Sequence, residues 1–554
     1  MKKRPGHFSV FRTLNISLII FLTGFASLYA QTITQEEVNS YIKGLPFDMP
    51  QIKLPSFASG TFDITKYGAV SDGITKNTEA IQKAIDECSS KGGMVIIPSG
   101  QWLTGPITLK SNVNLHLEAG ALVVFSSDFN DYPLTKYKGS SSYTCAYPIY
   151  ADGAENIAIT GNGLFNGSGQ IWRPVKKAKM NESQWKMLLK SDGVLNDKKD
   201  MWWPTEKAAK AEDFLKGKSV KELTLEDFES IKDYYRPHMV YLNNCKNVYF
   251  DGPTFQNSPK FAVYITKSEN MVINNVKINN EWFAQNGDGI DISACRNVLV
   301  SRCTVNAGDD GICMKSSTLK NVSGPALKNI VVADCIVYHA HGGFVIGSNT
   351  DGGMENIYVS NCSFVWTETG LRFKSGRGRG GLVEKVFINN IHMKDIEKEA
   401  VTFDLYYEDA GAAKTKNQKE ENKLPVFQNI TIDRVVCDGA EEALNINGLP
   451  GFNVRNIMLS NSVFNTEKGI ESTEAEGIKI DNVVFNSKAP ELFFLKNSRN
   501  FVLNSVKFNP NITSFMKLSG DRTSGIQIRN TKTGLLKTPF EFVDGADSKS
   551  VISE

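Results

Sequence analysis

The sequence holds two adjacent aspartates, Asp309 and Asp310, in the segment AGDDGI, and a third, Asp288, in the preceding segment NGDGID. Carboxylates that crowd together cannot all ionise easily, so one of them keeps its proton near neutral pH and can act as a general acid. An ionised neighbour can orient and deprotonate a water molecule. These residues predict acid–base hydrolysis, and an acid and a base about 6.5–9.5 Å apart would be the layout of an inverting glycosidase.

Three consecutive segments align without a gap, each beginning at a cysteine: CTVNAGDDGICMKS from 303, CIVYHAHGGFVIGS from 335 and CSFVWTETGLRFKS from 362. The earlier segment FAQNGDGIDIS joins the alignment at its second glycine. If each segment is one coil of a solenoid, equivalent residues stack about 4.8 Å apart. Asp288 and Asp310 then share one column, and Asp309, His341 and Glu368 share the adjacent column.

Two basic residues, Arg372 and Lys374, lie two and four residues beyond the glycine that sets this register, so they share one face of a strand. A guanidinium can grip a carboxylate through two parallel hydrogen bonds, and an ammonium adds a point charge. Basic groups beside three acids therefore predict a substrate that itself carries carboxylates, a uronic acid polymer. The flanking glycines, Gly308 and Gly311, are expected to allow a bend that turns both adjacent aspartates into one groove.

Short alternating strands recur along the chain and predict the scaffold of this groove. They read NVYFDG, NMVINN, NVLVSR, NIVVAD, NIYVSN, KVFINN, NITIDR, NIMLSN, GIKIDN and NFVLNS, and begin at 247, 270, 297, 329, 356, 385, 429, 456, 477 and 500. A period of mostly about 21–32 residues, with strands and almost no helix in each repeat, indicates a solenoid. We therefore expect an all-β fold, a parallel β-helix.

The rest of the chain divides around this scaffold. Residues 1–30 combine a basic start with a short apolar run and predict a signal peptide, followed by an N-terminal extension over 31–60 and a catalytic β-helix over 61–554. NTEAIQKAIDECSSKGG predicts an amphipathic helix that covers the open end of the solenoid. Residues at about 167–237 interrupt the repeats with four tryptophans and helix-like runs. This insertion either packs locally or offers rings that stack on sugars.

Composition excludes several classes of function. Removal of residues 1–30 takes away four positive charges and leaves a formal net charge of −2, which does not favour nucleic acid. No later run is long and apolar enough to span a membrane. The nine cysteines form no CxxC metal spacing and mostly recur at similar places in strands, so we expect small buried residues, with one or two disulfides as the alternative.

The motifs QNGDGID, AGDDGI, HAHGG and GLRFKS resemble, in order and spacing, the four signature motifs of the polygalacturonases, glycoside hydrolase family 28. FDITKYGAVSDGITKNTEAIQKAI and GGMVIIPSGQWLTGPITLKSNVNLHL resemble the opening of that family, and the resemblance covers roughly residues 61–510. It implies a right-handed parallel β-helix and inverting hydrolysis of α-1,4-galacturonosyl bonds in pectin. No cofactor and no metal are expected.

The resemblance also implies roles for the motif residues. Asp309 would be the general acid, Asp288 and Asp310 would hold and activate the attacking water, and His341 would tune Asp309 through a hydrogen bond. Arg372 and Lys374 would bind a galacturonate carboxylate. A tyrosine usually follows in the next coil, and Tyr406 or Tyr407 in DLYYED is the candidate. Glu368, by its column alone, is expected to line the same groove.

The sequence departs from the family pattern in several places. Gly287 stands where threonine is usual, Ala340 where glycine is usual, and Phe373 where isoleucine is usual. None of these changes removes a catalytic group. Asn286 fits either a strand turn or a substrate contact. Arg377 in SGRGRGG fits either a mobile basic loop or a further contact to an acidic polymer.

Rival functions remain at this point. A Ca²⁺-dependent pectate lyase would use the three aspartates as cation ligands and Arg372 as the base, although His341 is unhelpful beside Ca²⁺. A non-catalytic carbohydrate-binding β-helix explains the fold but not the acids. Within the hydrolases, rhamnogalacturonan or xylogalacturonan is an alternative backbone. The insertion and the loop at 408–425 are expected to block one end of the groove, which favours exo action on oligogalacturonides. The protein is also expected to be exported and monomeric.

Overall fold

The computed structural model describes the chain except for residues 1–31, 138–139, 141, 321, 408–422 and 554. The expected signal peptide and most of the 408–425 loop lie outside the described residues. Residues Ile33–Glu554 form one compact unit, which contains every element described below. None of the helices in the described part of the chain is long and apolar enough to cross a bilayer.

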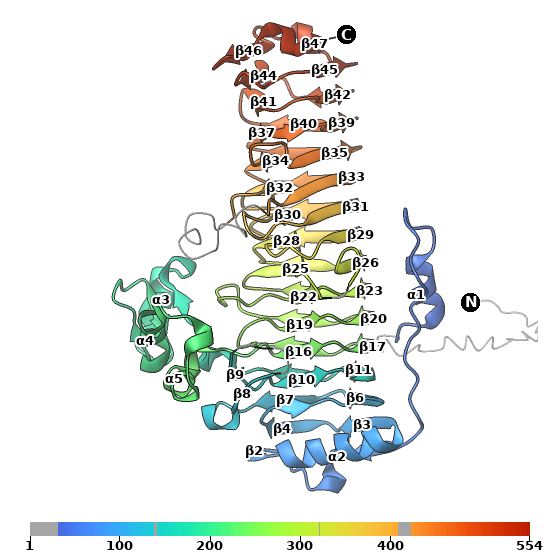
Figure 1. Ribbon diagram of the computed structural model, residues 1–554, viewed down its shortest axis with the longest axis vertical. Coiled ribbons are helices and arrows are strands. Elements are labelled where there is room, and N and C mark those ends of the chain that lie inside the picture. Colours follow the sequence, from blue (N-terminus) through green and yellow to red (C-terminus); the bar gives the residue numbers. More distant parts are fainter. Residues whose placement is uncertain (1–31, 138–139, 141, 321, 408–422, 554) are drawn as a thin grey trace, which may run out of the picture. The chain divides into compact units, whose positions relative to one another are not determined.

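Ile33–Glu554 is built from coils that stack into a right-handed parallel β-helix, which confirms the predicted fold (Figure 1). One sheet of 14 parallel strands carries the candidate site. Its strands are β5 (Ile107–Thr108), β10 (Ile149–Asp152), β16 (Val240–Asn243), β19 (Val263–Thr266), β22 (Ile290–Ser293), β25 (Asp310–Lys315), β28 (Gly342–Ile346), β30 (Leu371–Lys374), β32 (Glu399–Asp404), β34 (Glu442–Asn447), β37 (Lys468–Thr473), β41 (Glu491–Lys496), β44 (Ser514–Ser519) and β46 (Phe540–Val543).

The second large sheet contains the ten strands predicted from the repeats. They are β17 (Lys246–Asp251), β20 (Glu269–Asn274), β23 (Arg296–Ser301), β26 (Leu327–Ala333), β29 (Met354–Val365), β31 (Leu382–Lys394), β33 (Val426–Asp438), β35 (Val454–Ser460), β39 (Lys479–Asp481) and β42 (Val502–Asn504). Shorter strands, β12 (Leu164–Asn166), β18 (Thr254–Gln256), β21 (Lys277–Asn279), β24 (Thr304–Asn306) and β27 (Ile336–Tyr338), lead towards the site.

An asparagine ladder explains why so many of these strands begin with Asn. Asn247, Asn270, Asn297, Asn329 and Asn356 all have φ between 54° and 61°, a left-handed conformation that Asn tolerates better than most residues. Each side-chain amide donates a hydrogen bond to the asparagine one coil earlier, at 3.0–3.4 Å. The ladder therefore turns the chain at each coil and joins adjacent coils.

Columns of apolar side chains fill the interior of the coils. Ile292 pairs with Met314, which pairs with Ile346, and Phe373 continues the column. The rings of Phe373 and Phe403 stack with centroids 4.4 Å apart. Burial of apolar surface stabilises the fold by about 25 cal/mol per Å², and a one-residue slip would expose the whole column. This register is therefore strongly preferred. The phenylalanine that departs from the family motif is thus a core residue.

Helix α2 (Thr78–Lys91) closes the N-terminal end of the stack, below β3 (Gly93–Ile97) and β4 (Gly100–Thr104) in Figure 1. It buries the predicted face, namely Ala80, Ile81, Ala84, Ile85 and Cys88. Helix α1 (Gln35–Ile42) lies in the N-terminal extension, and Val38 packs against Leu299 and Val331 on the outside of the second sheet.

Residues 167–237 lie between β12 and β16. They form β13 (Val175–Lys176), β14 (Val194–Leu195), β15 (Met201–Trp203), α3 (Glu182–Leu188), α4 (Glu206–Leu215) and α5 (Leu225–Ser230). All four tryptophans of this segment, Trp172, Trp185, Trp202 and Trp203, are buried. They therefore pack locally and offer no free ring for stacking on a sugar.

The nine cysteines are all buried and unpaired, so the expectation of small core residues is confirmed.

Candidate active site

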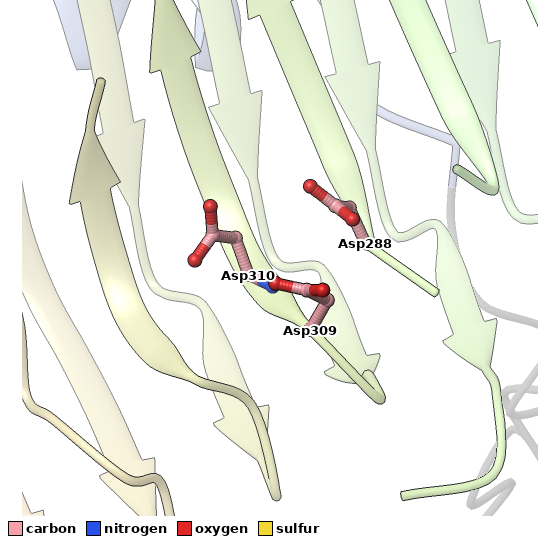
Figure 2. Close-up of side chains that lie close together, drawn as sticks. All are labelled: Asp288, Asp309 and Asp310. Atoms are coloured by element: carbon pink, nitrogen blue, oxygen red, sulfur yellow. The ribbon is translucent and has the colours of Figure 1, made fainter. Parts of the chain in front are cut away.

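Three aspartates converge at the ends of two neighbouring strands. Asp288 precedes β22, and Asp309 and Asp310 lie at the start of β25 (Figure 2). The pairing of Ile290 with Ile312 places Asp288 beside Asp310 in one column. One carboxylate oxygen from each aspartate lies within 4.8 Å of the others. The structure thus brings together the acids that the alignment placed in adjacent columns.

The chain bends at Gly308 and Asp309, just before β25, as expected. Neither Gly308 nor Gly311 has a positive φ, so these glycines are needed for space. A Cβ on Gly308 would lie 2.5 Å from the carbonyl oxygen of Ala284, and a Cβ on Gly311 would lie 2.5 Å from Cγ1 of Val337.

Asp310 is held by the two basic residues of the last motif. Lys374 Nζ lies 3.0 and 2.8 Å from its two carboxylate oxygens, and Arg372 Nη1 lies 3.8 Å from Oδ1. Burial alone would raise the pKa of Asp310, but the charge of Lys374 lowers it below its usual value. Asp310 is thus an ionised carboxylate with fixed orientation.

Asp309 contacts the histidine of the third motif. Nδ1 of His341 lies 3.1 Å from Oδ1 of Asp309, and Lys179 Nζ lies 3.0 Å from Nε2 of the same ring. Burial would raise the pKa of Asp309, but the hydrogen bond and charge of His341, with the charges of Lys374 and Lys179, lower it. An ammonium only donates, so Nε2 accepts and Nδ1–H faces Asp309.

Asp288 differs from its two neighbours because no cation binds it closely. Lys315 Nζ lies 3.6 Å from Oδ2 of Asp288 but is hydrogen-bonded to Asp291, and Oδ1 of Asp288 is buried without a partner. Burial, with the charges of Asp291 and Asp309, raises the pKa of Asp288 well above its usual value. Of the three acids, Asp288 is therefore the one whose surroundings most favour the protonated form.

Asn286 and Glu368 also border this site. Oδ1 of Asn286 accepts a hydrogen bond from Arg236 at 2.8 Å, and Asn286 itself has a φ of 54°. Glu368 lies 3.7 Å from Nε2 of His341 and is hydrogen-bonded to Lys398. The pKa of Glu368 is lowered, because Lys398 and His341 outweigh the effect of burial.

The tyrosine beside the basic pair is Tyr407. Its ring centroid lies 5.6 Å from the guanidinium of Arg372 and 4.8 Å from Lys374 Nζ. Tyr406, the residue chosen from the sequence, is 39% exposed, and the ring under both cations belongs to its neighbour. Arg377 is exposed beyond β30.

Sequence analysis missed the cations that the insertion brings into the site. Lys179 donates to the carbonyl oxygen of Gly308 at 2.8 Å as well as to His341, and Arg236 donates to the carbonyl oxygen of Gln285 at 2.7 Å. Both come from outside the repeats, so no register predicts them. The signal available was only that lysines and arginines accompany the tryptophans of this segment.

The three acids form one compact group. One oxygen from each carboxylate lies within 4.8 Å of the others, and Lys374 and Lys315 lie at the edge of the group. The pKa values of Asp309 and Asp310 are lowered and that of Asp288 is raised, so the members differ in how readily they hold a proton. Such a group can hold a water between two carboxylates while the third exchanges a proton with a leaving oxygen.

Comparisons with known proteins agree with this geometry. The family model of glycosyl hydrolases family 28 matches residues 227–484, and that of "Rhamnogalacturonase A/epimerase, pectate lyase-like" proteins matches residues 61–129. An exo-poly-alpha-D-galacturonosidase of Dickeya chrysanthemi is 28% identical over 405 residues, which cover 70% of this chain and 64% of that protein. An endo-polygalacturonase of Pectobacterium carotovorum is 26% identical over 373 residues, which cover 64% of this chain and 76% of that protein.

Among solved structures, an exopolygalacturonase from Thermotoga maritima superposes with a TM-score of 0.61 at 27% identity, covering 82% of this chain and 96% of that one. The β-helix, its acid cluster and these similarities define a glycoside hydrolase. Residues 227–484, which contain the three aspartates, match glycoside hydrolase family 28, and the chain is similar to members of that family over most of its length.

Proposed function

We propose that this protein is a polygalacturonase that hydrolyses α-1,4-galacturonosyl linkages in pectin. The observation that carries the proposal is the convergence of Asp288, Asp309 and Asp310 beside Arg372 and Lys374. The acids supply the proton transfers of glycoside hydrolysis, and the basic pair matches the carboxylate of a galacturonate. The exo- and endo-polygalacturonase relatives support this substrate.

Asp309 is the proposed general acid. The free site holds it ionised, chiefly because His341 and nearby lysines offset its burial. A galacturonate carboxylate that pairs with Lys374 or Lys179 would offset those positive charges and raise the pKa of Asp309. Substrate binding then moves a proton from Asp288 to Asp309, which delivers it to the leaving glycosidic oxygen.

Asp288 and Asp310 are the proposed water-holding pair. Once Asp288 has given up its proton, both carboxylates can accept hydrogen bonds from one water and take its proton as its oxygen attacks the anomeric carbon. Lys374 engages both oxygens of Asp310, which makes this carboxylate a poor nucleophile and a fixed acceptor. This engagement, together with the family resemblance, supports inversion.

Exo action is the preferred mode. Lys179 and Arg236 bring the insertion against the residues that flank the aspartates, and an insertion there would limit how far a polymer chain extends past the site. Exo-acting proteins stand among the similar relatives and structures. The expected early products from polygalacturonate are monomers or dimers with little loss of viscosity, whereas a ladder of long oligomers would indicate endo action.

A Ca²⁺-dependent lyase is the second candidate, because one oxygen from each of the three aspartates lies within 4.8 Å of the others. The Nζ of Lys374, 2.8 Å from Asp310, disfavours a cation there by repulsion. Reducing ends and absorbance near 235 nm should be followed together on polygalacturonate, with and without EDTA. Hydrolysis gives reducing ends alone and resists EDTA; a rise in absorbance that EDTA abolishes would mean a lyase.

We further propose that the protein is exported and acts on pectic polysaccharide or oligogalacturonide as a monomer. The support is the signal-like sequence of residues 1–30 and the polymeric nature of the substrate. Rhamnogalacturonan and xylogalacturonan are the comparison substrates in the same assay.

A further inference from the structure

Three cations near the catalytic aspartates have no carboxylate partner among the described residues. Lys179 binds a backbone carbonyl and the ring of His341, and Arg236 binds a carbonyl and the amide of Asn286. Lys260 lies over the ring of Phe261, 5.7 Å from its centroid. By contrast, Lys374 is paired with Asp310, and Lys315 is paired with Asp291.

The register places Lys260 in line with the acid of the site. Lys260, Gly287 and Asp309 each lie three residues before the mutually paired residues of β19, β22 and β25. Coils are about 4.8 Å apart, so Lys260 lies two coils, roughly 10 Å, from Asp309 along the stack. Phe261 also lies 5.1 Å from Lys315 Nζ, which in turn lies 3.6 Å from Asp288.

Lys260 and Arg236 therefore lie on the opposite side of the aspartates from Arg372 and Lys374, whereas Lys179 contacts the ring of His341 in the next coil. Asp310 pairs with Gly342 of β28, and Arg372 pairs with Val345 of the same strand, so the basic pair is towards the C-terminal coils. Lys260 is towards the N-terminal coils, and Arg236 is held against the loop that carries Asp288.

We propose that Lys260, with Arg236, forms a second carboxylate-binding subsite. It receives the uronate carboxylate of the sugar that lies across the scissile bond from the one held by Arg372 and Lys374. The inference rests on the proposed function, and it adds the residues that select a charged sugar on both sides of the bond.

The electrostatics of these groups fit an incoming anion. Burial lowers the pKa of Lys260 to about 8, with a further contribution from Arg236, and burial lowers the pKa of Arg236 to about 10. A buried cation without an anion is costly, and a bound carboxylate offsets that cost.

Lys260 is the residue to test, because it donates no hydrogen bond that positions an aspartate or His341. The assay compares wild type with Lys260→Met and Lys260→Arg on trigalacturonate at one pH. It then uses two trigalacturonate monomethyl esters, esterified at one or the other sugar that flanks the bond cleaved by wild type. Lys277→Met, an exposed lysine on β21, is the matched control.

We expect Lys260→Met to lower kcat/KM on trigalacturonate about tenfold, mainly through KM, and Lys260→Arg to restore much of it. On the ester whose methylated sugar occupies the second subsite, the kcat/KM of wild type should fall to that of Lys260→Met. On the other ester the tenfold difference in kcat/KM between the two proteins should persist. Equal rates for all forms on trigalacturonate, or the same difference on both esters, would overturn the second subsite alone. A wild type that hydrolyses no galacturonide would overturn the proposed function, and this inference with it.

Discussion

Lys179 Nζ lies 3.0 Å from Nε2 of His341, although the two residues are 162 positions apart in the chain. The contact joins the insertion to the column of Asp309 and His341 and fixes which ring nitrogen of His341 faces Asp309. The insertion therefore contributes charge to the candidate site, while two of its tryptophans, Trp185 and Trp202, pack together in a cluster of their own.

Lys179→Met tests this contact. The charge of Lys179 helps to lower the pKa of Asp309, so its removal raises that pKa and extends the protonated form to higher pH. If Asp309 is the general acid, the alkaline limb of the kcat/KM profile moves upward, and kcat falls about tenfold because the His341 ring loses its fixed tautomer. Lys207→Met on α4 is the control. An unmoved profile would contradict the assignment.

Asp288→Asn separates stability from activity. Because the folded-state pKa of Asp288 is raised, its protonated form stabilises the fold at low pH, and that stability is lost as pH rises through the folded pKa. Asparagine does not ionise, so the melting temperature of the variant should exceed that of wild type by about 2 °C at pH 8. At pH 3 the two melting temperatures should be equal. Its kcat should fall by about 10²–10⁴. Thermal melts at both pH values check the sign.

Gly308→Ala tests the close approach beneath Asp309. The added Cβ would lie 2.5 Å from the carbonyl oxygen of Ala284, so the chain must shift where the acid is held. We expect a loss of about 1–3 kcal/mol in the free energy of unfolding and a fall in kcat of about a hundredfold. Gly534→Ala, where the added Cβ meets nothing within 4 Å, should change neither. Urea denaturation and initial rates measure the two effects.

Tyr407→Ala and Tyr406→Ala discriminate between adjacent residues. The ring of Tyr407 lies beneath Arg372 and Lys374, so its loss frees the two cations proposed to bind a galacturonate carboxylate. KM should rise about five- to tenfold in Tyr407→Ala and stay near wild type in Tyr406→Ala. The reverse pattern would restore the sequence-based choice of Tyr406.

The repeat made most of the fold predictable from sequence. Asparagine at each coil start and the unbroken alignment of three segments set the register, and with it the columns of Asp288, Asp309 and His341. What sits outside the repeat was not predictable. Lys179 and Arg236 reach the site through an insertion whose path depends on its own packing, and the choice between Tyr406 and Tyr407 depends on how β32 ends.

The stereochemistry of hydrolysis tests the central account most directly, because inversion requires that water, and not an aspartate, attacks the sugar. Trigalacturonate should be hydrolysed inside an NMR tube, and the anomer of the newly formed reducing end recorded before mutarotation. The account predicts that the β-anomer appears first, since water attacks the α-linked carbon from the opposite face. The α-anomer as first product would contradict it and would make one of the aspartates a nucleophile.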